Sequence, residues 1–331
     1  MSSETVQRFV PYVQALGRGP GRSRPLTRAE AADALSLLLD EGAVDPYQAG
    51  AFLMLLRYRG EDGDELAGLV DAARRAVAAA APPGRAVDLD WPSYGAGRTR
   101  EAPWFLLAAV ALAAGGLRIA MHGSNEFSTG FSVADGLAAL GHPAASDRTD
   151  ALAQLAATGF AYLPLAALSP GLDRLLGLRR LFGLRSPINT LVRLIDPFDA
   201  LAGIDGVFHP PYIDRHIAAA VRLDRPRLLV MKGGGGEAER NPAKPMVARL
   251  HRRDADPVEI ALPALIDRPD GAATPIGLDG FRAVWRGEAA PLGATETIVG
   301  TMALALVAAG RAEPAEADAL ARDQWHDRPR R

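Results

Sequence analysis

The chain has 331 residues, of which 48% are hydrophobic and 23% charged, and it carries a formal net charge of −2. This length and composition predict a soluble globular protein that is large enough for two domains. Because cysteine is absent, disulfides, thiolate catalysis and zinc–thiolate sites are excluded, and we expect a cytoplasmic location. The longest apolar run, 102–117, is short and interrupted by glycine, so we expect no membrane partner.

Residues 1–81 show helical patterns only. The sequence Thr-Arg-Ala-Glu at 27–30 is a capping box that predicts a helix start, and an Asp-Pro pair at 45–46 predicts another. The second of these helices is apolar on more than one side around 52–56, so it needs two packing partners, one of which a second subunit could supply. Between the first helices, residues 17–25 form a basic loop that either contacts phosphate or is a solvated connector.

From Arg85 onward, short β-type runs alternate with helical patterns. Four such runs are found at 86–89, 118–121, 160–163 and 228–231. This alternation predicts a mainly parallel sheet with helices on both faces. The expected fold class is therefore α/β, with a small all-helical N-terminal domain before the sheet.

The most informative stretch runs from the strand at 118–121 through a polar loop to a helix that begins at about Ser132. The loop contributes six candidate anion-binding residues: His122, Gly123, Ser124, Asn125, Ser128 and Thr129. A helix N-terminus at the carboxyl end of a parallel strand presents backbone N–H groups and a favourable dipole to an anion. The alternative is a helix entry that is capped by its own Ser and Thr residues.

Two other strand ends carry groups that suit phosphate. The strand at 86–89 leads into a turn with four candidate phosphate-binding residues: Ser93, Gly95, Arg98 and Arg100. Arginines beside glycine bind phosphate through charge pairing and backbone N–H groups, although surface arginines without a ligand give the same pattern. The strand at 228–231 is followed by Lys232 and four glycines, which either let a phosphate approach the backbone or form a flexible turn.

Several of these motifs resemble those of a known family. Four of them resemble the phosphoribose-binding loop of the anthranilate phosphoribosyltransferase family, glycosyl transferase family 3: His122-Gly123, Ser128-Thr129, Ala134-Asp135 and the run 137–141. The segment 169–197 resembles the family stretch that crosses back to the helical domain. The resemblance implies a helical domain of residues 1–81, joined by part of 169–197, that forms a homodimer. It also implies an α/β domain of residues 82–331 that binds phosphate or phosphoribose.

The resemblance also implies an acceptor site. Arg179 matches the arginine that contacts the anthranilate carboxylate in active family members. The expected acceptor or nucleic-acid cleft consists of Arg179, Arg185, Asn189 and Lys232. His209 and Tyr212 are interpreted instead as a helix entry, because two prolines between them restrict that turn.

The chain departs from the family in the groups that handle diphosphate. Met121 stands for a lysine and Ser124 for an asparagine, and the turn at 93–100 lacks the acidic residue of active members. Where those enzymes place Asp-Glu to hold magnesium, this chain has Ala238 and Glu239. One carboxylate makes only a weak metal site, because magnesium needs several oxygen ligands in octahedral array. We therefore assign no cofactor from the sequence and expect magnesium only if the protein is an enzyme.

Two functions follow from these observations. Motifs at 92–94, 122–124, 209–213 and 236–242 look closest to the YbiB-like branch of the family, whose members bind nucleic acid. We therefore predict a family member with a degenerate active site that binds DNA or RNA, without sequence preference, through a phosphate-lined basic cleft. The alternative is an active phosphoribosyltransferase, which moves ribose 5-phosphate from phosphoribosyl diphosphate to an aromatic amine such as anthranilate, with mostly electrostatic catalysis.

Overall fold

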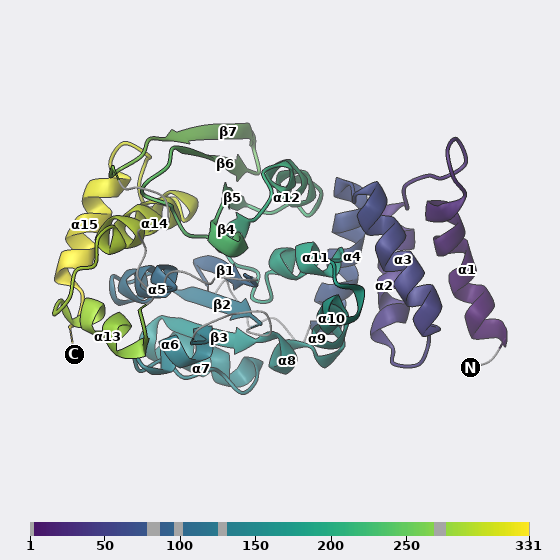
Figure 1. The fold of residues 1–331 in the computed structure, drawn as a ribbon, viewed down its shortest axis with the longest axis horizontal. Helices are drawn as coiled ribbons and strands as arrows, with labels where there is room; N and C mark the ends of the chain where they lie inside the picture. The colour runs from purple at the N-terminus through teal and green to yellow at the C-terminus, as the bar shows by residue number, and fades with distance from the viewer. Residues whose placement is uncertain (1–2, 78–86, 96–101, 125–130, 268–275, 331) are drawn as a thin grey trace.

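A bundle of helices lies beside a larger body that is built on a seven-stranded sheet (Figure 1). The computed structural model describes residues 3–77, 87–95, 102–124, 131–267 and 276–330. The architecture is α/β with a helical N-terminal domain, as the sequence predicts.

The bundle combines four N-terminal helices with three short ones from the middle of the chain: α1 (Ser3–Gly17), α2 (Arg28–Leu39), α3 (Pro46–Arg59), α4 (Gly63–Val77), α9 (Pro170–Gly177), α10 (Arg179–Phe182) and α11 (Ile188–Leu194). The predicted capping box starts α2: Thr27 Oγ1 accepts from the Glu30 N–H at 3.2 Å, and the Glu30 carboxylate accepts from the Thr27 N–H at 2.9 Å. Both sets of helices share one apolar core. In that core α3 buries Phe52, Leu53 and Leu56 within the protomer.

The sheet has the strand order β3-β2-β1-β4-β5-β6-β7. The strands are β1 (Leu89–Ser93), β2 (Ile119–Gly123), β3 (Phe160–Pro164), β4 (Ala202–Val207), β5 (Arg227–Lys232), β6 (Met246–Arg252) and β7 (Ala255–Leu262). The first five are parallel, and β6 and β7 add an antiparallel edge. The direction of strand addition reverses between β1 and β4, which is the position where open α/β sheets bind their ligands.

Two strands differ from the sequence prediction. β1 extends from the end of the predicted run 86–89 to Ser93. β4 is not predicted, because its glycines and Asp205 have low strand propensity. Tertiary contacts override that propensity: the Asp205 carboxylate is buried 2.7 Å from His216 Nδ1.

Helices cover both faces of the sheet. These helices, together with those that pack on them, are α5 (Trp104–Ala114), α6 (Val133–Ala138), α7 (Arg148–Thr158), α8 (Leu165–Leu168), α12 (Pro211–Arg222), α13 (Leu278–Arg286), α14 (Ala294–Ala308) and α15 (Ala317–Asp327). Along β5 the side chains alternate, so that Leu229 joins the core with α5 and α14, while Val230 joins the core with α12 and the bundle. Within the described part of the chain, no helix is long and apolar enough to cross a membrane.

A buried chain of charges joins the bundle to the sheet. Arg225 places Nη2 3.3 Å from Asp90 Oδ2 and 3.2 Å from Asp196 Oδ2. Arg74 of α4 lies 3.7 Å from the same Asp196 oxygen, and His122 Nε2 lies 3.2 Å from Asp90 Oδ1. Burial raises the pKa of Asp196 to about 6 even though the charge of Arg225 opposes the shift. Arg225 is therefore the common partner that lets two carboxylates lie in the interior.

We expect Arg225→Ala to lower the free energy of unfolding by about 3–5 kcal/mol, because it leaves two buried carboxylates without their shared cation. Urea unfolding followed by circular dichroism measures this loss. The matched control is Arg222→Ala, which removes an exposed pair with Asp64 at 2.9 Å. That pair should contribute at most about 1 kcal/mol. Equal losses in the two variants would contradict the stabilising role of the buried charges.

Candidate functional site

The carboxyl ends of β1, β4 and β5 meet beside the helical bundle, where α11 packs against β1 (Figure 1). The chain leaves these strands at Tyr94, Phe208 and Gly233. The reversal of strand order lies between β1 and β4, so the crevice outside their carboxyl ends is the expected ligand position. This crevice and the surface next to it form the candidate functional site.

The strand-end residues predicted to hold phosphate pack against one another. His122 is fully buried, and its Nδ1 lies 2.7 Å from the Tyr94 hydroxyl oxygen. The buried Ser93 accepts the Ser124 N–H at its carbonyl oxygen, at 3.2 Å. A Cβ on Gly123 would lie 2.1 Å from that same carbonyl oxygen, so glycine is required there. The ends of β1 and β2 are thus locked together, and the structure places His122 inside the core.

The other predicted phosphate-binding side chains are only partly described. Five of them lie outside the described residues, so their roles stay predictions: Arg98, Arg100, Asn125, Ser128 and Thr129. Lys232 ends β5 and is exposed. Gly95 follows β1 and lies at the crevice, as predicted, but its N–H already has a partner.

That partner is Glu237, which belongs to the motif at 236–242 but is given no role by the sequence analysis. Its Oε1 accepts a hydrogen bond from the Gly95 N–H, although 142 residues separate the two in the chain. The Glu237 side chain is buried, with the residue 4% exposed. Besides that motif, the signal in the sequence is a carboxylate directly after four glycines. Glu237 therefore places a carboxylate at the backbone donor where the sequence predicts a phosphate.

The described residues do not fit a protein-held magnesium site. Glu239 Oε2 accepts from the Phe105 N–H at 2.8 Å and so caps α5, whose N-cap residue Pro103 has no side-chain acceptor. Ala238, at the position of the family's aspartate, is fully buried. No group of three or more His, Cys, Asp or Glu side chains suited to a metal occurs among the residues that the structure describes. Glu239 is thus engaged as a helix cap.

Arg193 joins the loops on either side of the crevice. Its guanidinium donates to the carbonyl oxygens of Asn189 at 2.5 Å, Tyr94 at 2.8 Å and Gly206 at 3.2 Å. These carbonyls belong to α11, the turn after β1, and β4. Arg193 is 7% exposed, and burial lowers its pKa. One cation therefore fixes three segments of the site relative to one another.

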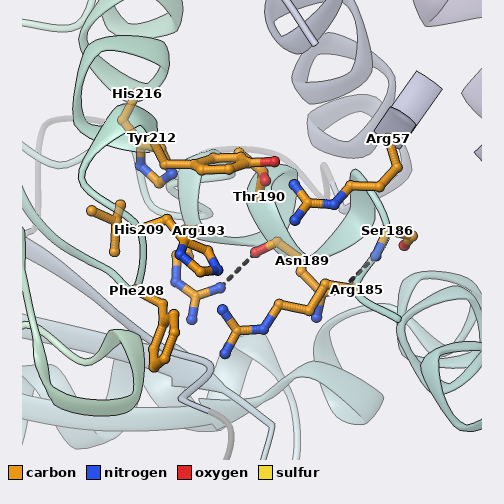
Figure 2. Close-up of a pocket in the computed structure, with 11 residues that line it drawn as sticks. Arg57, Arg185, Ser186, Asn189, Thr190, Arg193, Phe208, His209, Tyr212 and His216 are labelled. Atoms are coloured by element: carbon orange, nitrogen blue, oxygen red, sulfur yellow. Dashed lines mark hydrogen bonds between the residues drawn. The ribbon is translucent and has the colours of Figure 1, made fainter. Parts of the chain in front are cut away.

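A pocket lies next to Arg193, between α3, α11 and α12. It is lined by Arg57, Arg185, Ser186, Asn189, Thr190, Arg193, Val207, Phe208, His209, Tyr212 and His216. Figure 2 shows the guanidinium groups of Arg57, Arg185 and Arg193 turned toward the same space, below the ring of Tyr212. Among the residues that the structure describes, no carboxylate belongs to this lining. We refer to it as the arginine pocket.

Aromatic rings and neighbouring cations shape the electrostatics of the arginine pocket. The Arg185 guanidinium carbon lies 5.0 Å from the Phe208 ring centre, and that of Arg57 lies 5.2 Å from the Tyr212 ring centre. Burial, followed by the charges of Arg193, Arg179 and Arg57, lowers the pKa of Arg185 to about 10. Arg185 thus stays protonated at neutral pH but is held among like charges, so an anion in the pocket would relieve their repulsion.

The structure brings together only part of the predicted acceptor cleft. Arg185 and Asn189 line the arginine pocket, and the Asn189 side chain accepts from the Ser186 N–H at 2.9 Å. Arg179 is not in the lining, although its charge acts on Arg185. Arg57, which the sequence motifs do not reveal, comes from α3, more than a hundred residues away in the chain. No local pattern could have signalled that contact.

Arginines of the basic loop at 17–25 and of the segment 169–197 are engaged within the protein. Arg24 of the loop at 17–25 pairs with the Glu30 carboxylate through two hydrogen bonds, at 2.7 and 2.6 Å. Arg174 donates to the Leu38 carbonyl oxygen at 2.9 Å. The basic surface is therefore smaller than the number of arginines in the sequence suggests.

Comparison with known proteins extends this description. Residues 10–77 match the model of the glycosyl transferase family helical bundle domain, and residues 105–265 match that of the family's a/b domain. The anthranilate phosphoribosyltransferase of Methylobacterium nodulans is 32% identical over 328 residues, which cover 93% of this chain and 94% of that one. YbiB of Escherichia coli, described as uncharacterized, is 29% identical over 236 residues, covering 70% of this chain and 72% of that one.

A solved structure shows the same fold. The anthranilate phosphoribosyltransferase of Thermus thermophilus superimposes with a TM-score of 0.80 at 25% identity. The match covers 96% of this chain and 94% of that chain. Both domains therefore have counterparts in one known protein.

We expect Glu239→Ala to lower the free energy of unfolding by about 1–2 kcal/mol, because it leaves the Phe105 N–H without its acceptor. Glu239→Gln keeps an acceptor oxygen, so its free energy of unfolding should stay close to that of the wild-type protein. Thermal or urea unfolding with and without magnesium measures both effects. A magnesium-dependent rise in melting temperature that Glu239→Gln abolishes would show that Glu239 binds the metal instead.

Proposed function

We propose a function on the premise that this chain belongs to the anthranilate phosphoribosyltransferase family of glycosyl transferases. It binds an acidic aromatic acceptor in the arginine pocket and acts as a phosphoribosyltransferase with weak affinity for its donor. The observation that carries the proposal is a pocket with three arginines and two aromatic side chains but no carboxylate among its described lining residues.

The chemistry of the arginine pocket suits a planar carboxylic acid. A guanidinium binds a carboxylate through two parallel N–H donors. Arg57 and Arg185 offer such donors to this space, whereas Arg193 already donates to backbone carbonyls and contributes its charge. Phe208 and Tyr212 offer ring faces and edges to an aromatic ligand. Asn189 and His209 add a small number of polar groups, which would set the orientation of the ligand.

The phosphoribosyl transfer itself needs little covalent chemistry from the protein. A bond forms between the acceptor nitrogen and C1 of the ribose, and the bond from C1 to the departing diphosphate breaks. The nitrogen loses one proton, which the diphosphate or water accepts. Catalysis of such a step is mainly positioning and stabilisation of charge. In this chain, Arg193 fixes the segments that carry the acceptor pocket next to the strand ends. No step is assigned to magnesium, because the described residues do not fit a site for it.

Nucleic-acid binding is the second candidate. One observation favours it. Glu237 and Glu239 both accept hydrogen bonds from backbone N–H groups, so the carboxylates that could bind a diphosphate–magnesium complex are already engaged within the protein. In that case the arginine pocket would hold a backbone phosphate. The binding would weaken as salt rises. In a plot of the logarithm of the binding constant against the logarithm of the salt concentration, each phosphate contact would add roughly 0.7–0.9 to the negative slope.

We expect Arg185→Ala to weaken anthranilate binding by about 10–100-fold, because it removes a charge-assisted hydrogen bond worth about 1.5–3 kcal/mol. Calorimetry measures the affinity, and diphosphate release from phosphoribosyl diphosphate measures transfer on the same preparation. The matched control is Arg286→Ala, which removes one exposed arginine from α13, outside the pocket lining.

The same preparation separates the two candidates. Salt-sensitive binding of a polynucleotide that Arg185→Ala abolishes, without any anthranilate binding, would overturn the transferase and support the second candidate. If Arg185→Ala and Arg286→Ala bind anthranilate equally strongly, the acceptor binds outside the arginine pocket.

A homodimer through the helical domains is also proposed. The apolar residues that first suggest it, around 52–56 in α3, are largely buried within the protomer. The same helix nevertheless exposes Tyr47 at 87% and Tyr58 at 93%, and Leu181 and Leu184 of the bundle are also exposed. Large exposed apolar side chains of this kind favour an interface.

We expect the purified protein to be a dimer by light scattering at micromolar concentration. Tyr47→Ser combined with Tyr58→Ser should shift it toward the monomer, because the paired substitution removes two large exposed rings. Exposed Val258 of β7, replaced by Ser, is the control from the α/β domain. A monomeric unchanged protein at that concentration would overturn the proposed dimer.

A further inference from the structure

We propose that Glu237 is a specificity-determining residue, whose carboxylate occupies the anion-binding crevice between β1 and β4 and weakens the binding of a diphosphate-bearing donor. The inference rests on the proposed function, because it concerns the donor side of the same cleft. Neither the resemblance nor the acceptor pocket assigns any role to this residue.

The carboxylate lies at the backbone donor that an incoming anion would use. Gly95 is the second residue after β1, and its N–H donates to Glu237 Oε1. Backbone N–H groups at the carboxyl ends of parallel strands are the usual anion donors of such sheets. A Cβ on Gly95 would lie 2.2 Å from Oε1 and 2.8 Å from Cδ, so only glycine leaves room for this carboxylate.

The backbone around Glu237 is held as closely as its side chain. A Cβ on Gly206 of β4 would lie 2.1 Å from the Glu237 carbonyl carbon, and one on Gly233 would lie 1.5 Å from its carbonyl oxygen. That oxygen also accepts from the Glu239 N–H at 2.8 Å. Three glycines from three different strand ends therefore make room for one glutamate. Such close packing indicates that Glu237 has a fixed position in the crevice.

Among the described residues, Glu237 and Arg193 bring opposite charges to the crevice. Arg193 is buried, and among neighbouring charges that of Glu237 acts most strongly to keep it protonated against the effect of burial on its pKa. A diphosphate placed here would have to displace the carboxylate from the Gly95 N–H or lie beside it. Like charges at close range in a dry crevice repel strongly. An anionic ligand is thus favoured in the arginine pocket and disfavoured at the β1–β4 crevice.

Two substitutions separate the effect of the Glu237 charge from that of its hydrogen bond with the Gly95 N–H. Glu237→Gln removes the negative charge but keeps an acceptor for Gly95, whereas Glu237→Ala removes both. The probe is inorganic pyrophosphate, followed by phosphoribosyl diphosphate, each titrated by calorimetry with and without magnesium. The control is Glu259→Gln, which makes the same charge change on exposed β7. Circular dichroism and thermal unfolding establish that each variant is folded.

We expect Glu237→Ala to bind pyrophosphate about tenfold or more tightly than the unchanged protein, with Glu237→Gln between them and Glu259→Gln unchanged. If Glu237→Ala does not fold, tighter binding by the folded Glu237→Gln still supports the inference. Folded variants that bind pyrophosphate no more tightly than the unchanged protein would overturn it.

Anthranilate binding in the same variants keeps the two proposals apart. Tighter pyrophosphate binding without any anthranilate binding would support the role of Glu237 while the proposed acceptor failed. Normal anthranilate binding with unchanged pyrophosphate binding would leave the acceptor pocket intact and reject the role of Glu237.

Discussion

The hydrogen bonds of Arg193 are the constraint on which the site depends. One buried guanidinium binds carbonyl oxygens from α11, from the turn after β1 and from β4. A buried cation needs nearly all of its N–H groups satisfied, so these segments cannot move apart without leaving donors unpaired. The same side chain closes the β1–β4 crevice on one side and lines the arginine pocket on the other. The β1–β4 crevice and the arginine pocket are therefore mechanically connected.

Electrostatics divide that cleft into two unlike halves. At the crevice, Glu237 supplies a negative charge and takes the Gly95 N–H. In the arginine pocket no carboxylate is found among the described lining residues, and the pKa of Arg185 falls to about 10 through burial and like charges. An anion therefore gains most where repulsion between cations is relieved, and least where a carboxylate is already bound. On the proposed function, this difference rather than total charge would decide where an anion binds in a chain whose net charge is only −2.

Much of the fold could be predicted from local patterns. The capping box at Thr27, the alternation of strands and helices, and the family motifs predict a helical domain followed by an α/β domain, which the structure has. β4 could not be predicted, because glycine and aspartate are poor strand formers and only burial of Asp205 against His216 compensates for them. Of the residues predicted for the cleft, Arg185 and Asn189 lie in one pocket, and their role stays a prediction.

By itself, the sequence determined the fold class, the family and the approximate positions of β2, β3 and β5, because these follow from periodicity and from motifs that are contiguous in the chain. Only the tertiary structure decided which charges are used internally. It paired Arg24 with Glu30, set Glu239 at the start of α5, and brought Glu237 to Gly95 across 142 residues. Such contacts depend on how strands are ordered in the sheet, and a charge in a sequence carries no sign of whether its partner is solvent, ligand or protein.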